Sequence, residues 1–141
     1  MLLLDTNVLI YATGADHPLQ AGCRRILASI GTTTQPIAVT DTVIAEFVHA
    51  RSRRSSRQEA VALAAEFVAA VDVVVPLNDA SRRRALALYA ATSRISINDA
   101  LIAAAALEAN AVLVSADADF EEVAGLEWLR PTSAELEGLL A

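Results

Sequence analysis

The chain has 141 residues, 55% of them hydrophobic, and its mean hydropathy of +0.43 excludes intrinsic disorder and favours one domain over residues 1–141. No apolar run reaches the roughly 18 residues of a membrane span, and the start of the chain lacks the basic residues of a signal peptide, so we expect a cytoplasmic protein without membrane contact. The single cysteine, Cys23, excludes an intramolecular disulfide, and a net charge of −6 disfavours nucleic acid unless the charge is unevenly distributed.

Short apolar runs alternate with helical patterns along the whole chain. Strands are predicted over residues 1–5, 37–40, 72–75, 111–115 and 126–129. Helices are predicted over residues 17–30, 41–51, 56–71, 78–92, 97–110 and 133–140. This alternation predicts an α/β fold in three α/β/α layers, with a mainly parallel central sheet of four or five strands. Ligands of such folds bind at the carboxyl ends of the strands.

The basic residues are concentrated in the middle of the chain. All 11 of them are arginine, and residues 48–94 hold eight arginines and four acids, a local charge of +4 that leaves −10 for the remainder. Arginine clusters bind phosphate groups, although solvated helix faces have the same composition. The candidates for weak RNA contacts are Arg51, Arg53, Arg54 and Arg57.

Four acids lie where acids are uncommon. Asp5 ends the first predicted strand, and Asp117 follows the strand over residues 111–115, so both are expected at the same edge of a parallel sheet. Glu46 and Asp99 lie close to the apolar stripes of their predicted helices. Ionised carboxylates that face a core are costly unless they are paired or bound to a metal.

Each of these acids also has a purely structural interpretation. Asp99 completes a capping box that begins at Ser96, and Asp5 is able to cap a helix that starts near Asn7. Asp117 fits an Asx turn, and Glu46 is able to reach solvent from the edge of its stripe. Taken singly these interpretations are favoured, but the joint occurrence of all four weakens them.

An oxygen-only cluster without His or Cys partners favours a hard cation, Mg²⁺ or Mn²⁺, over zinc. Such cations act on phosphate esters by activating water and by neutralising phosphoryl charge. Neither His17 nor His49 is expected to serve as a general base, since both are predicted to be solvated. We therefore expect attack by water, which leaves a 5′-phosphate and a 3′-hydroxyl.

Three segments together resemble the PIN domain family. They are Leu3-Leu4-Asp5-Thr6-Asn7-Val8-Leu9-Ile10, then Asn98-Asp99-Ala100-Leu101-Ile102, and finally Val112-Leu113-Val114-Ser115-Ala116-Asp117-Ala118-Asp119-Phe120. The resemblance spans essentially the whole chain, and its length and element order are similar to the stand-alone VapC toxins of VapBC toxin–antitoxin pairs. Ala116 departs from the basic residue that many relatives carry there.

The resemblance implies site residues. It assigns Asp5, Glu46, Asp99 and Asp117 to an acidic, catalytic metal pocket, with Glu46 the least fixed by a motif. Thr6, Asn7 and Ser115 are implied as polar companions of that pocket, and Asp119 as a supporting residue or a further ligand.

The resemblance also implies a function. VapC-like proteins are Mg²⁺- or Mn²⁺-dependent endoribonucleases that cleave tRNA or rRNA and inhibit translation, and they form homodimers that a VapB antitoxin holds inactive. The alternatives from the residues alone are another metal phosphoesterase, acting on DNA or a small phosphate ester, and a non-catalytic interaction module whose carboxylates only cap helices.

Overall fold

The computed structural model describes residues 1–141 and confirms the predicted α/β fold. Its five strands form one parallel sheet in the order β3-β2-β1-β4-β5. In chain order the strands are β1 (Leu2–Leu4), β2 (Ile37–Thr40), β3 (Val73–Val75), β4 (Val112–Val114) and β5 (Trp128–Leu129).

Seven α-helices and one 3₁₀ helix connect these strands. The α-helices are α1 (Thr6–Thr13), α2 (Gln20–Ala28), α3 (Asp41–Arg54), α4 (Arg57–Ala70), α5 (Asp79–Ala91), α6 (Ile97–Glu108) and α7 (Ala134–Leu140). The 3₁₀ helix, η1, covers Ala118–Glu122 between β4 and β5.

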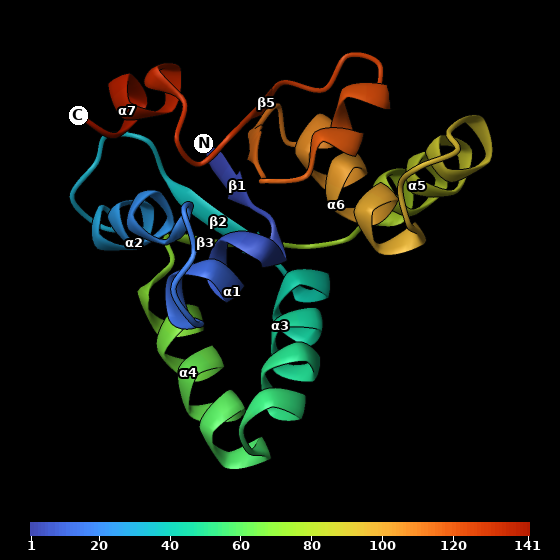
Figure 1. Ribbon diagram of the computed structural model, residues 1–141. Coiled ribbons are helices and arrows are strands. Elements are labelled where there is room, and N and C mark those ends of the chain that lie inside the picture. Colours follow the sequence, from blue (N-terminus) through green and yellow to red (C-terminus); the bar gives the residue numbers. More distant parts are fainter.

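The strand order places helices on both faces of the sheet. From β1 the chain runs through β2 to the edge strand β3, and it then crosses back to β4 on the other side of β1. Right-handed crossovers that run in opposite directions along a sheet lie on opposite faces of it. Helices α1 to α4 therefore cover one face, and α5 and α6 cover the other. In Figure 1, α3 and α4 form a hairpin that points away from the sheet, and α5 and α6 form a second hairpin at its side.

Short polar side chains fix where the helices begin. Thr40, Ser56, Asn78, Ser96 and Ser133 each accept a hydrogen bond from a backbone N–H in the first turn of the helix that follows. These bonds satisfy N–H groups that have no partner within the helix. The starts of α3 and α6, which carry two of the candidate acids, are thereby defined.

The three inner strands and α6 form the core. Almost every residue of β1, β2 and β4 is buried, which explains their nearly uninterrupted apolar sequences. Helix α6 buries Ala100 and Ala103–Ala106, whose small side chains allow it to approach the sheet closely. This packing holds the amino end of α6 over the carboxyl edge of the sheet.

Helix α1 entered the sequence interpretation only as the helix near Asn7 that Asp5 is able to cap, and it was not among the predicted helices. Its residues, Thr-Asn-Val-Leu-Ile-Tyr-Ala-Thr, include β-branched and aromatic types that favour strands as much as helices. The helix forms because Asp5 caps it and because Val8, Leu9 and Ala12 pack into the core. The predicted helix over residues 17–30 is shorter, Gln20–Ala28, and η1 was not predicted.

None of the helices combines the length and the apolar composition that a bilayer crossing requires.

Candidate active site

Pairing between β1 and β4 brings Asp5 beside Ser115. Leu4 lies opposite Val114 in the parallel ladder, and the next backbone bond runs from the Asp5 N–H to the Val114 carbonyl at 3.0 Å. Asp5 and Ser115 are therefore the first residues past the carboxyl ends of neighbouring strands. Their side chains are buried, with Asp5 4% exposed.

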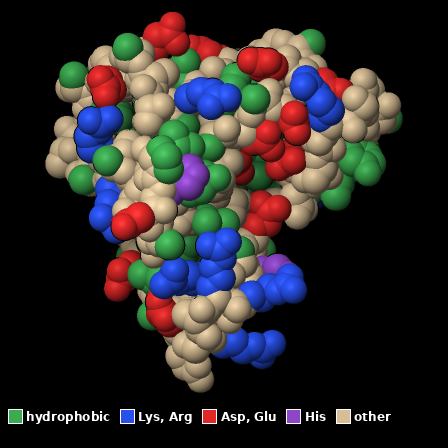
Figure 2. Space-filling model, in the orientation of Figure 1, with side chains coloured by type: hydrophobic (Ala, Val, Ile, Leu, Met, Phe, Trp, Pro, Cys, Tyr) green, Lys and Arg blue, Asp and Glu red, His purple; other side chains and the backbone are tan.

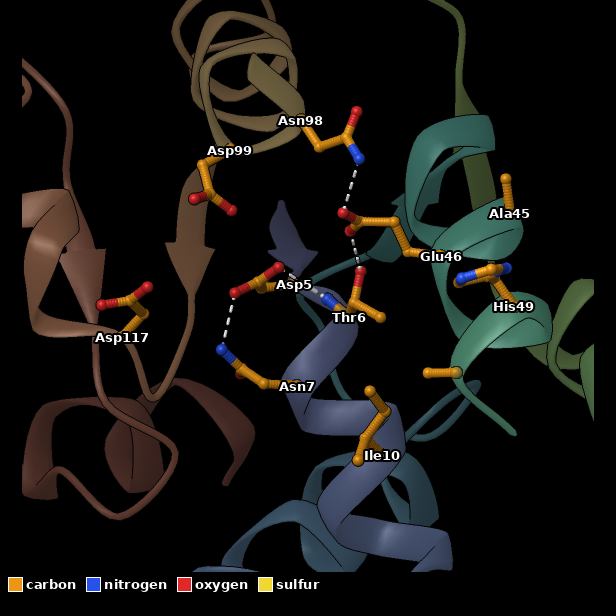
Figure 3. Close-up of a pocket in the computed structure, with 11 residues that line it drawn as sticks. Asp5, Thr6, Asn7, Ile10, Ala45, Glu46, His49, Asn98, Asp99 and Asp117 are labelled. Carbon is orange, nitrogen blue, oxygen red and sulfur yellow. Dashed lines mark hydrogen bonds between the residues drawn. The ribbon is translucent and has the colours of Figure 1, made fainter. Parts of the chain in front are cut away.

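A cavity of about 550 Å³ opens at this edge of the sheet. Figure 3 shows the carboxylates of Asp5, Glu46, Asp99 and Asp117 directed into it from four separate parts of the chain. The complete lining is Asp5, Thr6, Asn7, Ile10, Ala45, Glu46, His49, Ala50, Asn98, Asp99 and Asp117. The four acids that the sequence singled out thus share one cavity.

Neutral donors hold the Asp5 carboxylate in place. Its Oδ1 accepts from the Thr6 N–H at 2.7 Å, and its Oδ2 accepts from the Ser115 hydroxyl at 2.6 Å and from the Asn7 amide at 2.7 Å. Asn7 also accepts a bond from the Ala116 N–H at 3.1 Å, so it joins α1 to the loop after β4. No cation neutralises Asp5, because all of its hydrogen-bond partners are uncharged.

Glu46 on α3 is held at both oxygens. Its Oε2 accepts from the Thr6 hydroxyl at 2.6 Å, and its Oε1 accepts from the Asn98 amide at 2.8 Å. Figure 3 shows both bonds as dashed lines, one to Asn98 and one to Thr6. Glu46 is therefore bonded to α1 and α6 at once.

Asp99 and Asp117 are capping residues as well as lining residues. Asp99 Oδ2 accepts from the Ser96 N–H at 2.9 Å within a complete capping box, and Asp117 Oδ1 accepts from the Asp119 N–H at 2.9 Å at the start of η1. The structural interpretations of these two acids are correct, yet both still face the cavity. Asp99 Oδ1 and Asp117 Oδ2 accept no hydrogen bond, which leaves them free for a ligand.

The electrostatics of the cavity oppose ionisation of its innermost acids. Burial raises the pKa of Asp5 to about 6; bonds from Ser115 and the Thr6 N–H oppose the rise, and the charges of Asp99 and Glu46 add to it. Burial also raises the pKa of Asp99 against its bonds with Ser96, and Asp117 and Glu46 add to that rise. The cavity therefore gathers negative charge that nothing in the chain neutralises.

The donor set fits a hard divalent cation by its chemistry. All four acidic lining residues offer carboxylate oxygen, the ligand that Mg²⁺ and Mn²⁺ prefer. No three of these side chains are close enough to surround an ion as they stand. Asp99 and Asp117 each keep one carboxylate oxygen without a hydrogen bond, so these two side chains are the most available to a cation.

The remaining predicted polar residues divide into two groups. Thr6, Asn7 and Ser115 contact the acids directly, as described above. Asp119 does not line the cavity and faces Arg94, with 3.6 Å between its Oδ1 and the Arg94 Nη1.

Sequence reasoning missed two polar lining residues, Asn98 and His49, as well as the apolar lining residues Ile10, Ala45 and Ala50. Asn98 lies directly before Asp99, so its position at the start of a capped helix was the available signal. His49 was expected to be solvated and to have no role in the site. It is exposed, as expected, but it also lines the cavity one helical turn after Glu46.

The predicted arginines lie around the corner between α3 and α4. Arg51 is engaged by the chain itself, since it donates to the Thr13 carbonyl at 3.2 Å and forms an ion pair with Glu59. Arg53, Arg54 and Arg57 are exposed and have no carboxylate partner. Figure 2 shows arginine side chains over this hairpin, below a hollow rimmed by acidic side chains.

Comparison with known proteins identifies relatives across the chain. The PIN domain family profile matches residues 2–126. Ribonuclease VapC7 of Mycobacterium tuberculosis is 38% identical over 142 residues, covering 99% of this chain and 98% of that protein. Ribonuclease VapC43 of the same species is 32% identical and covers 96% of this chain and 98% of its own.

Solved structures share the fold. Mycobacterium tuberculosis VapC20, described as a Sarcin-Ricin loop cleaving toxin, has a TM-score of 0.75 at 20% identity and covers 89% of this chain and 96% of its own. VapBC2 from Rickettsia felis, bound to a DNA fragment, has a TM-score of 0.73 at 21% identity, with 92% and 97% covered.

We expect the free energy of unfolding to fall as pH rises from 3.8 to about 6. In this interval the folded chain keeps the Asp5 proton that the unfolded chain releases, so ionisation costs the folded state up to about 3 kcal/mol. Urea titrations at a series of pH values measure this fall. Asp5→Asn reduces it and leaves the contribution of Asp99, whose pKa is also raised. The exposed Asp79→Asn on α5 is the control and keeps the full fall, whereas parallel curves for wild type and Asp5→Asn would contradict the assignment.

Proposed function

The chain belongs to the VapC group of the PIN domain family, and on that premise we propose that it is a metal-dependent endoribonuclease. The reaction is hydrolysis of a phosphodiester bond within RNA. The observation that carries the proposal is the convergence of four carboxylates from four parts of the chain on one cavity. The name Ribonuclease VapC7, carried by a relative that is 38% identical over nearly the full length of both chains, supports RNA as the substrate.

The proposed cofactor is Mg²⁺ or Mn²⁺, held by Asp5, Asp99 and Asp117 with Glu46. A divalent cation at such a site supplies charge neutralisation for the phosphoryl oxygens and an activated water. The free oxygens of Asp99 and Asp117 favour these two residues as direct ligands. Asp5 contributes through Oδ1, since its Oδ2 already accepts two hydrogen bonds.

The other polar residues orient the acids. Ser115 and Asn7 fix the Asp5 carboxylate, and Thr6 and Asn98 fix both oxygens of Glu46, so the acids keep their directions despite mutual repulsion. Without a cation the same negative charge repels a phosphate group. In this proposal the chain therefore admits RNA to the cavity only when the acids are neutralised.

The same proposal covers the biological role. The chain acts as the toxin of a VapBC pair, cleaves tRNA or rRNA and thereby inhibits translation, and functions as a homodimer that a VapB-type antitoxin restrains. The support is the VapC name shared by relatives at 31–38% identity, together with the VapBC assemblies that have the same fold.

We expect Asp5→Asn and Asp99→Asn each to reduce RNA cleavage about 100-fold or more and to weaken Mn²⁺ binding, because each removes a charged ligand. Both variants remain folded, since each removal also lowers the repulsion in the cavity. Gel assays with Mn²⁺, calorimetry and thermal melts provide the three readouts. Asp79→Asn, an exposed acid on α5, is the matched control and retains full activity.

Two outcomes would contradict the proposal. Equal cleavage of DNA of the same sequence would make the chain a general phosphoesterase, and unchanged metal affinity in both variants would remove the pocket assignment. The product ends test the nucleophile, since water attack leaves a 5′-phosphate. A 2′,3′-cyclic phosphate would instead assign His49, which lines the cavity, as the base for attack by the 2′-hydroxyl.

We expect Asn98→Ala to lower the cleavage rate about tenfold, because Glu46 then keeps only its bond from Thr6. Asn98→Asp lowers the rate further, since a carboxylate then faces Glu46 Oε1. Melting temperatures stay close to that of the wild type in both. Gln58→Ala, which removes an exposed amide on α4, is the control and keeps the wild-type rate. Equal losses of cleavage rate in Asn98→Ala and Asn98→Asp would contradict the role of Asn98 in positioning Glu46.

A further inference from the structure

A second hollow adjoins the acidic cavity. It has the same volume, about 550 Å³, and lies between α3 and α4; we call it the α3–α4 groove. The two hollows share Ala45 and His49 in their linings, so they are continuous across one turn of α3. A ligand that enters the acidic cavity along α3 therefore passes through the groove.

The chemistry of the groove is the opposite of that of the cavity. Its remaining lining consists of Val48, Ser52, Arg57 and Val61, without any acid. Val61 is 57% exposed, so its side chain is accessible to a ligand in the groove. The groove thus offers one cation, one hydroxyl and an apolar wall.

Arg57 differs from the arginines of α5 and the following turn. Arg82 and Arg83 pair with Asp79, Arg84 pairs with Glu108, and Arg94 pairs with Asp119 and Glu122. Arg57 has no carboxylate or hydrogen-bond acceptor for its guanidinium, and neither have Arg53 and Arg54 at the same corner. The arginines of residues 48–94 that are free to bind an anion therefore lie mainly beside the groove.

We propose that the α3–α4 groove binds the nucleotide of a single-stranded RNA segment next to the scissile phosphate. Arg57 contacts a phosphate of that segment, the aliphatic wall of Val48 and Val61 supports its base, and the His49 ring stacks at the junction of the two hollows. This inference rests on the proposed ribonuclease function and extends it to the path of the substrate.

The electrostatics favour this occupant. The four acids of the cavity offer no contact to a phosphate other than the one that is hydrolysed, so the strand must be held by positive charge outside the cavity. Two hollows that share lining residues with the cavity carry arginine and lack acids. The groove has room for a nucleotide, whereas the other, beside Arg51 and Arg54, holds only about 30 Å³. The lining of the groove suits a single strand with an unstacked base, since two valines offer an apolar surface to the base and Arg57 offers a cation to a phosphate.

The test measures binding of a 5′-fluorescein oligouridine of about 12 nucleotides by anisotropy, with Ca²⁺ in place of Mg²⁺ and RNA integrity checked on gels. Arg57→Ala is expected to weaken binding about five- to tenfold and to reduce the salt slope by about 0.7, the value for one lost phosphate contact on a single strand. His49→Ala and Val61→Ser weaken binding about three- to fivefold with an unchanged salt slope.

Arg83→Ala, an exposed arginine on α5, is the matched control and leaves affinity and slope unchanged. Crosslinking with 4-thiouridine is expected to label α3 and α4 in the wild type and to be reduced by Val61→Ser. If Arg57→Ala and Arg83→Ala bind alike, or if crosslinks map elsewhere, the groove is not the RNA path and serves another occupant, such as a segment of a partner protein.

The two proposals fail separately. Wild-type protein that cleaves RNA with Mn²⁺ while Arg57→Ala binds normally would overturn the groove and leave the ribonuclease function intact. Wild-type protein that binds RNA through Arg57 without cleaving it would overturn the ribonuclease function alone.

Discussion

Burial of the Asp5 carboxylate, in a cavity that three further acids line, is the constraint on which the site depends. Burial and neighbouring negative charges raise the pKa of Asp5 to about 6, so the folded chain holds this acid at a cost near neutral pH. The hydrogen bonds of Ser115, Asn7 and Thr6 offset part of the cost, and β1 and β4 supply the backbone pairing that keeps these residues in contact. A bound cation would remove the remaining cost of ionising Asp5, so binding of the cation would also stabilise the fold.

The same carboxylates serve both the fold and the site. Asp5 caps α1, Asp99 completes the capping box of α6, and Asp117 begins η1. A carboxylate has two oxygens with two lone pairs each, so accepting one backbone bond leaves capacity for a ligand. Capping also fixes the side-chain direction, which places the free oxygens of Asp99 and Asp117 toward the cavity without further support.

Much of this arrangement is predictable from the sequence. Asp5 and Asp117 follow strands whose parallel pairing is implied by the alternating pattern, and parallel strands place their carboxyl ends at one edge. Helix α1 was anticipated only through the capping interpretation of Asp5, because its residues have a weak helical preference that the cap and tertiary packing override. His49 lies one turn after Glu46 on α3 and Asn98 directly precedes Asp99 on α6, so their proximity to the acids was available from the sequence. The bond from Asn98 to Glu46 was not, because it depends on how α3 and α6 pack against each other. The charge count likewise identified residues 48–94 as a basic segment. Only the structure shows which of its arginines form ion pairs, such as those of α5, and which have no carboxylate partner.

Calorimetric titration with Mn²⁺ at pH 6, in two buffers of different ionisation enthalpy, tests the central claim most directly. If Asp5 is half protonated near its pKa of about 6 and becomes a ligand, binding releases roughly half a proton there and almost none near about pH 8. The apparent enthalpy then differs between the buffers at pH 6 and agrees between them at the higher pH. Equal enthalpies in both buffers at pH 6, with Mn²⁺ bound, would contradict the account, because the buried acid would then have no part in binding the cation.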